Sequence, residues 1–165
     1  MTERFRVVPA VYVLFLRGDE VLLQLRRGTG FLDDHWAAGA AGHVEAGESV
    51  FAAAVREARE ELDVVVDAAD LEPLGVLHRT AEPHGPVDER VDFFFACRHW
   101  SGDPRRAEED RAAELRWFRL GDLPVPVVPH ELRVLGQLRA GHVDPIAVHG
   151  FEPRTGAVSG AAPRR

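Results

Sequence analysis

Two runs of apolar residues near the start of the chain predict a β-hairpin. Val11 to Leu16 and Val21 to Leu25 are apolar at nearly every position, and the pair Gly18-Asp19 between them favours a tight turn. A strand with one face in water alternates apolar and polar residues, so these continuous runs indicate strands covered on both faces.

A helical spacing of apolar residues follows further along the chain. Ser49 is a suitable N-cap, and the next apolar positions recur every three or four residues. They are Phe51, Ala54, Val55, Ala58 and Leu62. This pattern predicts a helix from Ser49 to Leu62.

The pattern of the rest of the chain predicts further strands and one more helix. We expect a short strand near Trp36, strands within residues 71–80, 89–100 and 114–120, and a loop over 81–88. Leu132, Leu135 and Leu138 predict a helix over 129–141. The order favours an α/β (α+β) fold in which a mixed β-sheet lies between helices. Residues 142–165 have little periodicity, so we expect a domain over 1–141 and a flexible C-terminal tail.

Composition limits the class of protein. The chain has 165 residues, 45% hydrophobic and 28% charged, as expected of one globular domain. Its net charge of −7 opposes nucleic-acid binding. The single cysteine, Cys97, lies in an apolar run and is expected in the core. No apolar run is long enough to span a membrane and the start lacks a signal-peptide pattern, so we expect a cytoplasmic protein without a membrane partner.

Three glutamates crowd together on the first predicted helix. Glu57, Glu60 and Glu61 lie at positions i, i+3 and i+4, where side chains are neighbours and like charges repel. A solvated, salt-bridged helix face is the ordinary interpretation of such a cluster. However, carboxylates that converge on one point also provide the oxygen ligands that Mg²⁺ prefers. The glycine-bearing loop before the helix can bring backbone groups close to an ion or a phosphate.

The spacing of these residues resembles the signature of Nudix hydrolases, G-x5-E-x7-R-E-U-x-E-E-x-G-U, in which U is an aliphatic or small apolar residue. The matching positions are Gly42, Glu48, Arg56, Glu57, Ala58, Glu60, Glu61 and Val64. Asp63 departs from the pattern, because the family has a glycine there. Ala41 also replaces a glycine that many relatives carry beside this loop.

The resemblance implies an α/β/α sandwich and a hydrolase that cleaves a pyrophosphate bond in a nucleoside diphosphate linked to another group. It implies Mg²⁺ or Mn²⁺ as cofactor. Glu57, Glu60 and Glu61 would be metal ligands, joined by the carbonyl of Gly42, and Arg56 would orient the cluster by pairing with Glu48 and Glu60. The expected substrate is a small nucleotide-type molecule rather than a nucleic acid. The sequence leaves open a homodimer and the identity of the general base.

The sequence also offers candidates for substrate binding outside the signature. Arg26 and Arg27 end the second strand and are candidates for a substrate phosphate, with a solvated strand end as the alternative. Trp36 and Phe31 are candidates for stacking on a base, with burial in the core as the alternative. In the acidic stretch Glu108, Glu109 and Asp110, one residue is a candidate for a further ligand or base.

Two other functional classes remain open. A nucleotide-binding sensor of the same fold, weak in catalysis, would control a partner, but such sensors often lose signature acids that are complete here. An isomerase of the same fold would need further Cys and Glu residues that we do not find.

Overall fold

The fold is a mixed β-sheet with one helix packed on each side. The computed structural model describes residues 5–81 and 88–151. The helices are α1 (Val50–Leu62) and α2 (Pro129–Arg139), with a 3₁₀ turn, η1, at Ala68–Asp70. The strands are β1 (Val8–Arg17), β2 (Glu20–Arg26), β3 (Trp36–Ala38), β4 (Ala40–His43), β5 (Leu71–Arg79), β6 (Arg90–Cys97), β7 (Ala112–Arg119) and β8 (Ile146–His149).

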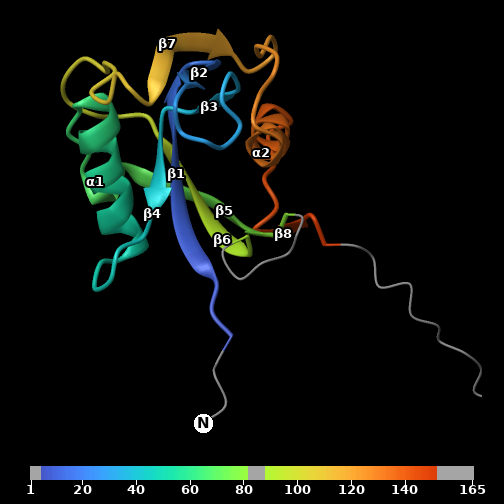
Figure 1. Cartoon of the computed structure of the whole chain (residues 1–165). Coiled ribbons are helices and arrows are strands. Elements are labelled where there is room, and N and C mark those ends of the chain that lie inside the picture. Colours follow the sequence, from blue (N-terminus) through green and yellow to red (C-terminus); the bar gives the residue numbers. More distant parts are fainter. Residues whose placement is uncertain (1–4, 82–87, 152–165) are drawn as a thin grey trace, which may run out of the picture.

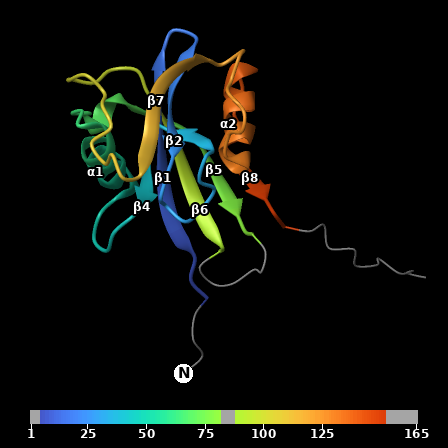
Figure 2. The same ribbon diagram turned by 45° about the horizontal axis from the view of Figure 1, so that its top comes forward.

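Within the described residues the strands form a sheet in the order β3-β2-β1-β6-β5-β8, with β4 beside β1 and β7 beside β2. The pairs β1–β6 and β5–β8 are parallel and the others are antiparallel. Figure 1 shows α1 and α2 on opposite sides of the sheet, and Figure 2 shows the same arrangement from another angle. The expected α/β fold with a mixed sheet between helices is confirmed.

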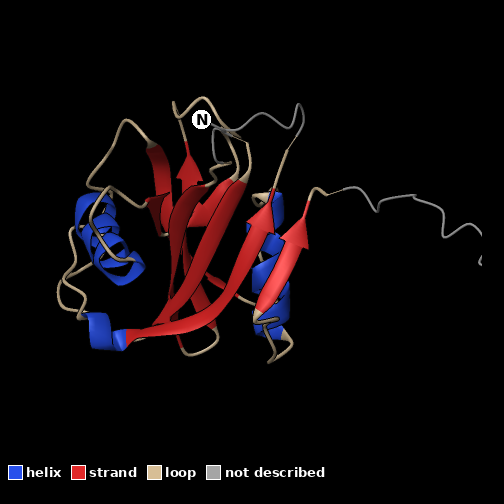
Figure 3. Ribbon diagram, turned by 90° about the horizontal axis from the view of Figure 1, so that it is seen from below, coloured by secondary structure: helices blue, strands red, loops and turns tan. Residues whose placement is uncertain are grey.

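Strand β1 explains the continuous apolar runs. Its side chains alternate between two cores: Val13 and Phe15 pack with α1, whereas Tyr12 and Leu14 pack with α2. Because helices cover both faces, neither set can be polar. Figure 3 shows the strands between the helices from below. Cys97 is buried in the core beside α1, as expected.

Helix α1 begins and ends as the sequence predicts. The hydroxyl of Ser49 accepts a hydrogen bond from the backbone N–H of Ala52 at 3.1 Å, and Ala54, Ala58 and Leu62 are buried. For α2 the expected apolar stripe is wrong at one position, because Leu132 is 44% exposed. The buried face of α2 instead carries His130 and Glu131 with Val134 and Leu135.

The chain remains ordered beyond Gly141, where the sequence predicted the domain to end. Residues 146–149 form β8, which pairs with β5 from Val76 to Arg79. Most of the loop expected over 81–88 and most of the predicted tail lie outside the described residues. No helix in the described ranges is long and apolar enough to cross a membrane.

Candidate active site

Arg56 on α1 ties the acidic residues of the signature together. Its guanidinium donates hydrogen bonds to Glu48 at 2.7 and 3.2 Å, to Glu57 at 2.7 Å and to Glu60 at 3.0 Å. It also donates to the backbone carbonyl of His43 at 3.0 Å. The pairing with Glu48 raises the pKa of Arg56 and lowers the pKa of Glu48. The contacts expected between Arg56, Glu48 and Glu60 are therefore present, and Arg56 links the loop before α1 to the helix.

Gly42 leaves space for the carboxylate of Glu57. A Cβ atom built on Gly42 would overlap both oxygens of that carboxylate. Gly42 lies opposite Val11 in the pairing of β4 with β1, so its backbone is held in the sheet. Burial raises the pKa of Glu57, opposed by Arg56 and reinforced by Glu60 and Glu108.

Glu61 reaches across to two strands. One of its carboxylate oxygens accepts hydrogen bonds from the backbone N–H of Ala41 at 2.9 Å and from the side chain of Gln24 at 3.2 Å. Glu61 is only partly exposed, because β2 and β4 cover part of it. Burial raises the pKa of Glu61 to about 8, and the charges of Glu57 and Glu108 act in the same direction. By contrast, the side chain of Glu60 is 52% exposed.

The loop after β6 closes the C-terminal end of α1 and brings a further acid to the cluster. The backbone N–H groups of Arg105 and Ala107 donate to the carbonyls of Leu62 and Glu61, at 3.0 and 2.9 Å. These bonds satisfy carbonyls that a helix end leaves without partners. Residue 108 follows directly, and this is why the charge of Glu108 acts on Glu57 and Glu61.

The three glutamates of α1 offer carboxylate oxygens, the kind of ligand that a hard divalent cation prefers. In each of Glu57, Glu60 and Glu61 one oxygen accepts a hydrogen bond, and within the part of the chain that the structure describes none reaches the other oxygen. Contrary to the expectation from the sequence, the carboxylates of Glu57, Glu60 and Glu61 do not converge on one point. Within residues 5–81 and 88–151 no group of acids, histidines or cysteines is placed to hold a metal ion, and the guanidinium of Arg56 bridges Glu57 and Glu60. Three carboxylates, each with one oxygen left for a ligand, match the preference of Mg²⁺ or Mn²⁺ for oxygen.

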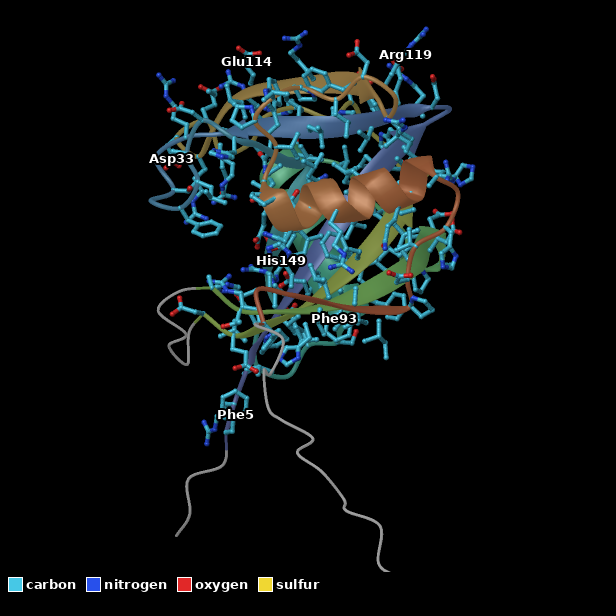
Figure 4. All side chains as sticks on the ribbon, turned by 90° about the vertical axis from the view of Figure 1, so that its right-hand side faces the viewer. Phe5, Asp33, Phe93, Glu114, Arg119 and His149 are labelled. Carbon is cyan, nitrogen blue, oxygen red and sulfur yellow. The ribbon has the colours of Figure 1, made fainter. Side chains whose placement is uncertain are left out.

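The two arginines at the end of β2 lie in different surroundings. Arg26 donates to the carbonyl of Phe31 and to the hydroxyl of Thr29, both at 2.9 Å, so it holds the loop between β2 and β3. Figure 4 shows this loop with Asp33 labelled. Arg27 is exposed, and its backbone N–H donates to the carbonyl of Arg111. These contacts indicate that Arg26 shapes the loop.

Of the two aromatic candidates, Trp36 is buried, the alternative favoured for both, and Phe31 is not. Trp36 is buried in the core beside α2, where its ring packs edge-to-face on Phe118 with centroids 4.6 Å apart. Phe31, for which burial was the favoured alternative, is 48% exposed, with the guanidinium of Arg26 5.7 Å from its ring centroid. The structure therefore favours a role in core packing for Trp36 over stacking on a base.

The three acidic residues before β7 also lie in different surroundings. Glu109 and Asp110 are exposed, whereas Glu108 is the member whose charge acts on Glu57 and Glu61. The sequence did not separate these three residues. It also missed Gln24, because a glutamine in an apolar strand has no signature spacing, although a polar residue between Leu23 and Leu25 in a covered strand was a usable signal.

Comparison with known proteins identifies the class to which this fold and site belong. A family model described as the NUDIX domain matches residues 6–138. The chain belongs to the Nudix family.

Several named proteins are similar to the chain. The NAD-capped RNA hydrolase NudC of Pseudomonas aeruginosa is 34% identical over 146 residues, which cover 86% of this chain and 48% of that protein. The enzyme of the same name from Pseudomonas fluorescens is 30% identical, with 86% and 49% covered. The chain thus spans about half the length of these curated relatives. The crystal structure of a MutT NUDIX hydrolase from Burkholderia pseudomallei superposes with a TM-score of 0.73, at 27% identity, covering 81% of this chain and 98% of that one.

Proposed function

We propose that the chain hydrolyses a pyrophosphate bond in a nucleoside diphosphate linked to another group, with Mg²⁺ or Mn²⁺ as cofactor. The observation that carries the proposal is the arrangement around Arg56, which holds Glu48, Glu57 and Glu60 in one hydrogen-bonded group within a Nudix domain. Glu57, Glu60 and Glu61 would hold the cation, together with the carbonyl of Gly42. When bound, it supplies positive charge for the phosphates and lowers the pKa of a water molecule.

The residues of the chain prepare this site in three ways. The absent side chain at Gly42 leaves room for the carboxylate of Glu57 against β4. Arg56 offsets repulsion between the acids and fixes the direction of two of them. The bonds from Ala41 and Gln24 fix one oxygen of Glu61, so that the other remains for a ligand. The carboxylates are coupled, so one of them is not singled out as the base.

The names of the relatives support a nucleotide-type substrate. The Pseudomonas proteins are named for the hydrolysis of NAD-capped RNA, in which NAD contains a pyrophosphate between two nucleosides. The net charge of −7 favours a small molecule over RNA for this chain. That preference remains a prediction and is one arm of the test.

The test is a substrate screen with identified products. The purified chain is incubated with Mg²⁺ or Mn²⁺ and with NAD, NAD-capped RNA, ADP-ribose, nucleotide sugars, nucleoside triphosphates and dinucleoside polyphosphates. Mass spectrometry should find two phosphate-bearing products from cleavage between adjacent phosphorus atoms, and a chelator should abolish them. If no compound in these classes is cleaved with either cation, the proposal is wrong. Cleavage of capped RNA but not of free NAD would contradict the small-molecule preference.

A further inference from the structure

Two arginines and two histidines lie on one face of the sheet, at one end. In the strand pairing, His43 lies opposite Ala10, Arg90 lies opposite Arg79, and Arg79 lies opposite His149. Side chains alternate between the faces of a strand, so all four share the side covered by α2. Figure 4 labels His149 on this side, below α2. We call His43, Arg90, Arg79 and His149 the basic row.

Arg79 is used inside the protein. It is buried, and its guanidinium donates to the carboxylate of Asp92 and, at 3.3 Å, to the hydroxyl of Tyr12. Asp92 is fully buried, so its charge and that of Arg79 compensate each other. Arg79 is therefore a structural member of the row.

Arg90 is held in a different way. It is only partly buried, and one nitrogen of its guanidinium donates to Nε2 of His43 at 2.8 Å. A guanidinium has no acceptor, so the imidazole nitrogen must accept and carries no proton there. Unlike a carboxylate, a neutral imidazole orients the arginine without cancelling its charge.

His43 connects Arg90 to the acidic cluster. It directly follows Gly42, and its backbone carbonyl accepts the hydrogen bond from Arg56. The ring of His43 thus contacts Arg90, and its backbone carbonyl contacts Arg56. Gly42 faces α1 and Glu57, whereas the ring of His43 faces the α2 side, so His43 joins the two guanidinium groups at this end of the sheet.

We propose that Arg90, oriented by His43, binds a phosphate oxygen of the substrate. This inference rests on the proposed function. In it, Arg90 pairs with the negative charge of the phosphates that remains after the cation has bound. A diphosphate brings negative charge into a site that already contains several glutamates. A guanidinium is suited to this role because it can donate two parallel hydrogen bonds to phosphate oxygens.

The test uses methylenediphosphonate, a diphosphate analogue that is not hydrolysed, as the probe. Its affinity is measured by calorimetry in the presence of Mg²⁺ for the wild type and for Arg90→Gln, Arg90→Lys and His43→Phe. Arg90→Gln should weaken binding by about 10- to 100-fold, and the other two by less, since they keep a cation. Arg17→Gln, a change at an exposed arginine in the β1–β2 hairpin, is the matched control and should bind as the wild type does. Equal affinity of Arg90→Gln and the wild type would overturn the inference.

Two further measurements distinguish phosphate binding by Arg90 from a role in folding or in cation binding. Thermal unfolding checks that each variant is folded, and Mn²⁺ affinity in the absence of the probe should be unchanged by Arg90→Gln. If Arg90→Gln does not fold, Arg90→Met is measured in its place, and binding as tight as that of the wild type overturns the inference. A wild type that binds the probe but hydrolyses no substrate would overturn the proposed function alone. A wild type that hydrolyses substrates but does not bind the probe would overturn only the role of Arg90.

Discussion

The carboxylate of Asp63 accepts two hydrogen bonds from the guanidinium of Arg105, at 2.5 and 3.0 Å, although 42 residues separate them in sequence. Asp63 ends α1 in the left-handed conformation, with φ 54° and ψ 35°, at the position where the family signature has glycine. Arg105 lowers the pKa of Asp63 and offsets the unfavourable effect of a negative charge at a helix C-terminus. The departure from the signature is thus matched by a partner in the loop that caps the helix.

Substitution of Asp63 separates the backbone effect from the ion pair. Asp63→Ala removes the carboxylate and keeps a Cβ atom in the left-handed region, whereas Asp63→Gly removes both the carboxylate and the steric cost. We therefore expect Asp63→Gly to unfold at a higher denaturant concentration than Asp63→Ala. Should the alanine variant match or exceed the glycine variant, the left-handed conformation of residue 63 carries no cost.

Substitution of Gly42 tests the space occupied by Glu57. Gly42→Ala would place a Cβ atom on the carboxylate of Glu57 and so displace it. We expect Mn²⁺ affinity, measured by calorimetry, to fall by about 10- to 100-fold, as for other changes that misplace a metal ligand. Gly121→Ala is the matched control, because a Cβ atom there meets no neighbour within 4 Å. Unchanged Mn²⁺ affinity in Gly42→Ala would show that Glu57 does not need this position.

Glu131 predicts a pH dependence of stability. It is 2% exposed, accepts a hydrogen bond from the backbone N–H of Ala38 at 2.5 Å, and has a pKa raised by burial from 4.5 to about 7. Because the folded state holds this proton more tightly, the associated stability is present below pH 4.5 and is lost as the pH rises through about 7. Glu131→Gln keeps an oxygen acceptor and removes the charge.

We expect the free energy of unfolding of Glu131→Gln to rise relative to the wild type by roughly 3 kcal/mol between pH 4.5 and 7.5. The measurement is denaturant unfolding of both proteins across this range. The other titrating groups are common to both proteins, so their contributions cancel in the difference. A difference that stays constant with pH would show that Glu131 remains charged in the folded protein.

Cation binding should stabilise the folded protein. An ion that binds only the folded state raises the free energy of unfolding, by ~3 kcal/mol at 100 times its dissociation constant. We expect Mn²⁺ to raise the melting temperature of the wild type but not that of a variant with Glu57, Glu60 and Glu61 all changed to Gln. An equal shift in both proteins would place the bound ions elsewhere.

The sequence predicted those parts of the molecule that depend on local spacing. Helix α1, its Ser49 cap and the grouping of Glu48, Arg56 and Glu60 all follow from positions close together in the chain. The continuous apolar runs predicted strands covered on both faces, as β1 shows.

The features that the sequence did not predict depend on contacts between distant segments. Arg105 reaches Asp63 and Gln24 reaches Glu61 only because loops and strands far apart in the chain meet at α1. The exposure of Leu132 follows from a helix that buries the polar residues His130 and Glu131. Strand β8 has only four residues, too few to show a periodicity, and it is ordered by pairing with β5.

The role proposed for the acidic cluster of α1 is tested most directly by the rate of Mg²⁺-dependent pyrophosphate hydrolysis by Glu60→Gln. Glu60 is exposed, so its loss should leave the melting temperature unchanged, while the missing carboxylate removes a proposed ligand. On a substrate that the wild type cleaves, at saturating Mg²⁺, we predict that turnover falls by about 100-fold or more. A rate close to that of the wild type would contradict the claim that the acidic cluster of α1 carries the reaction.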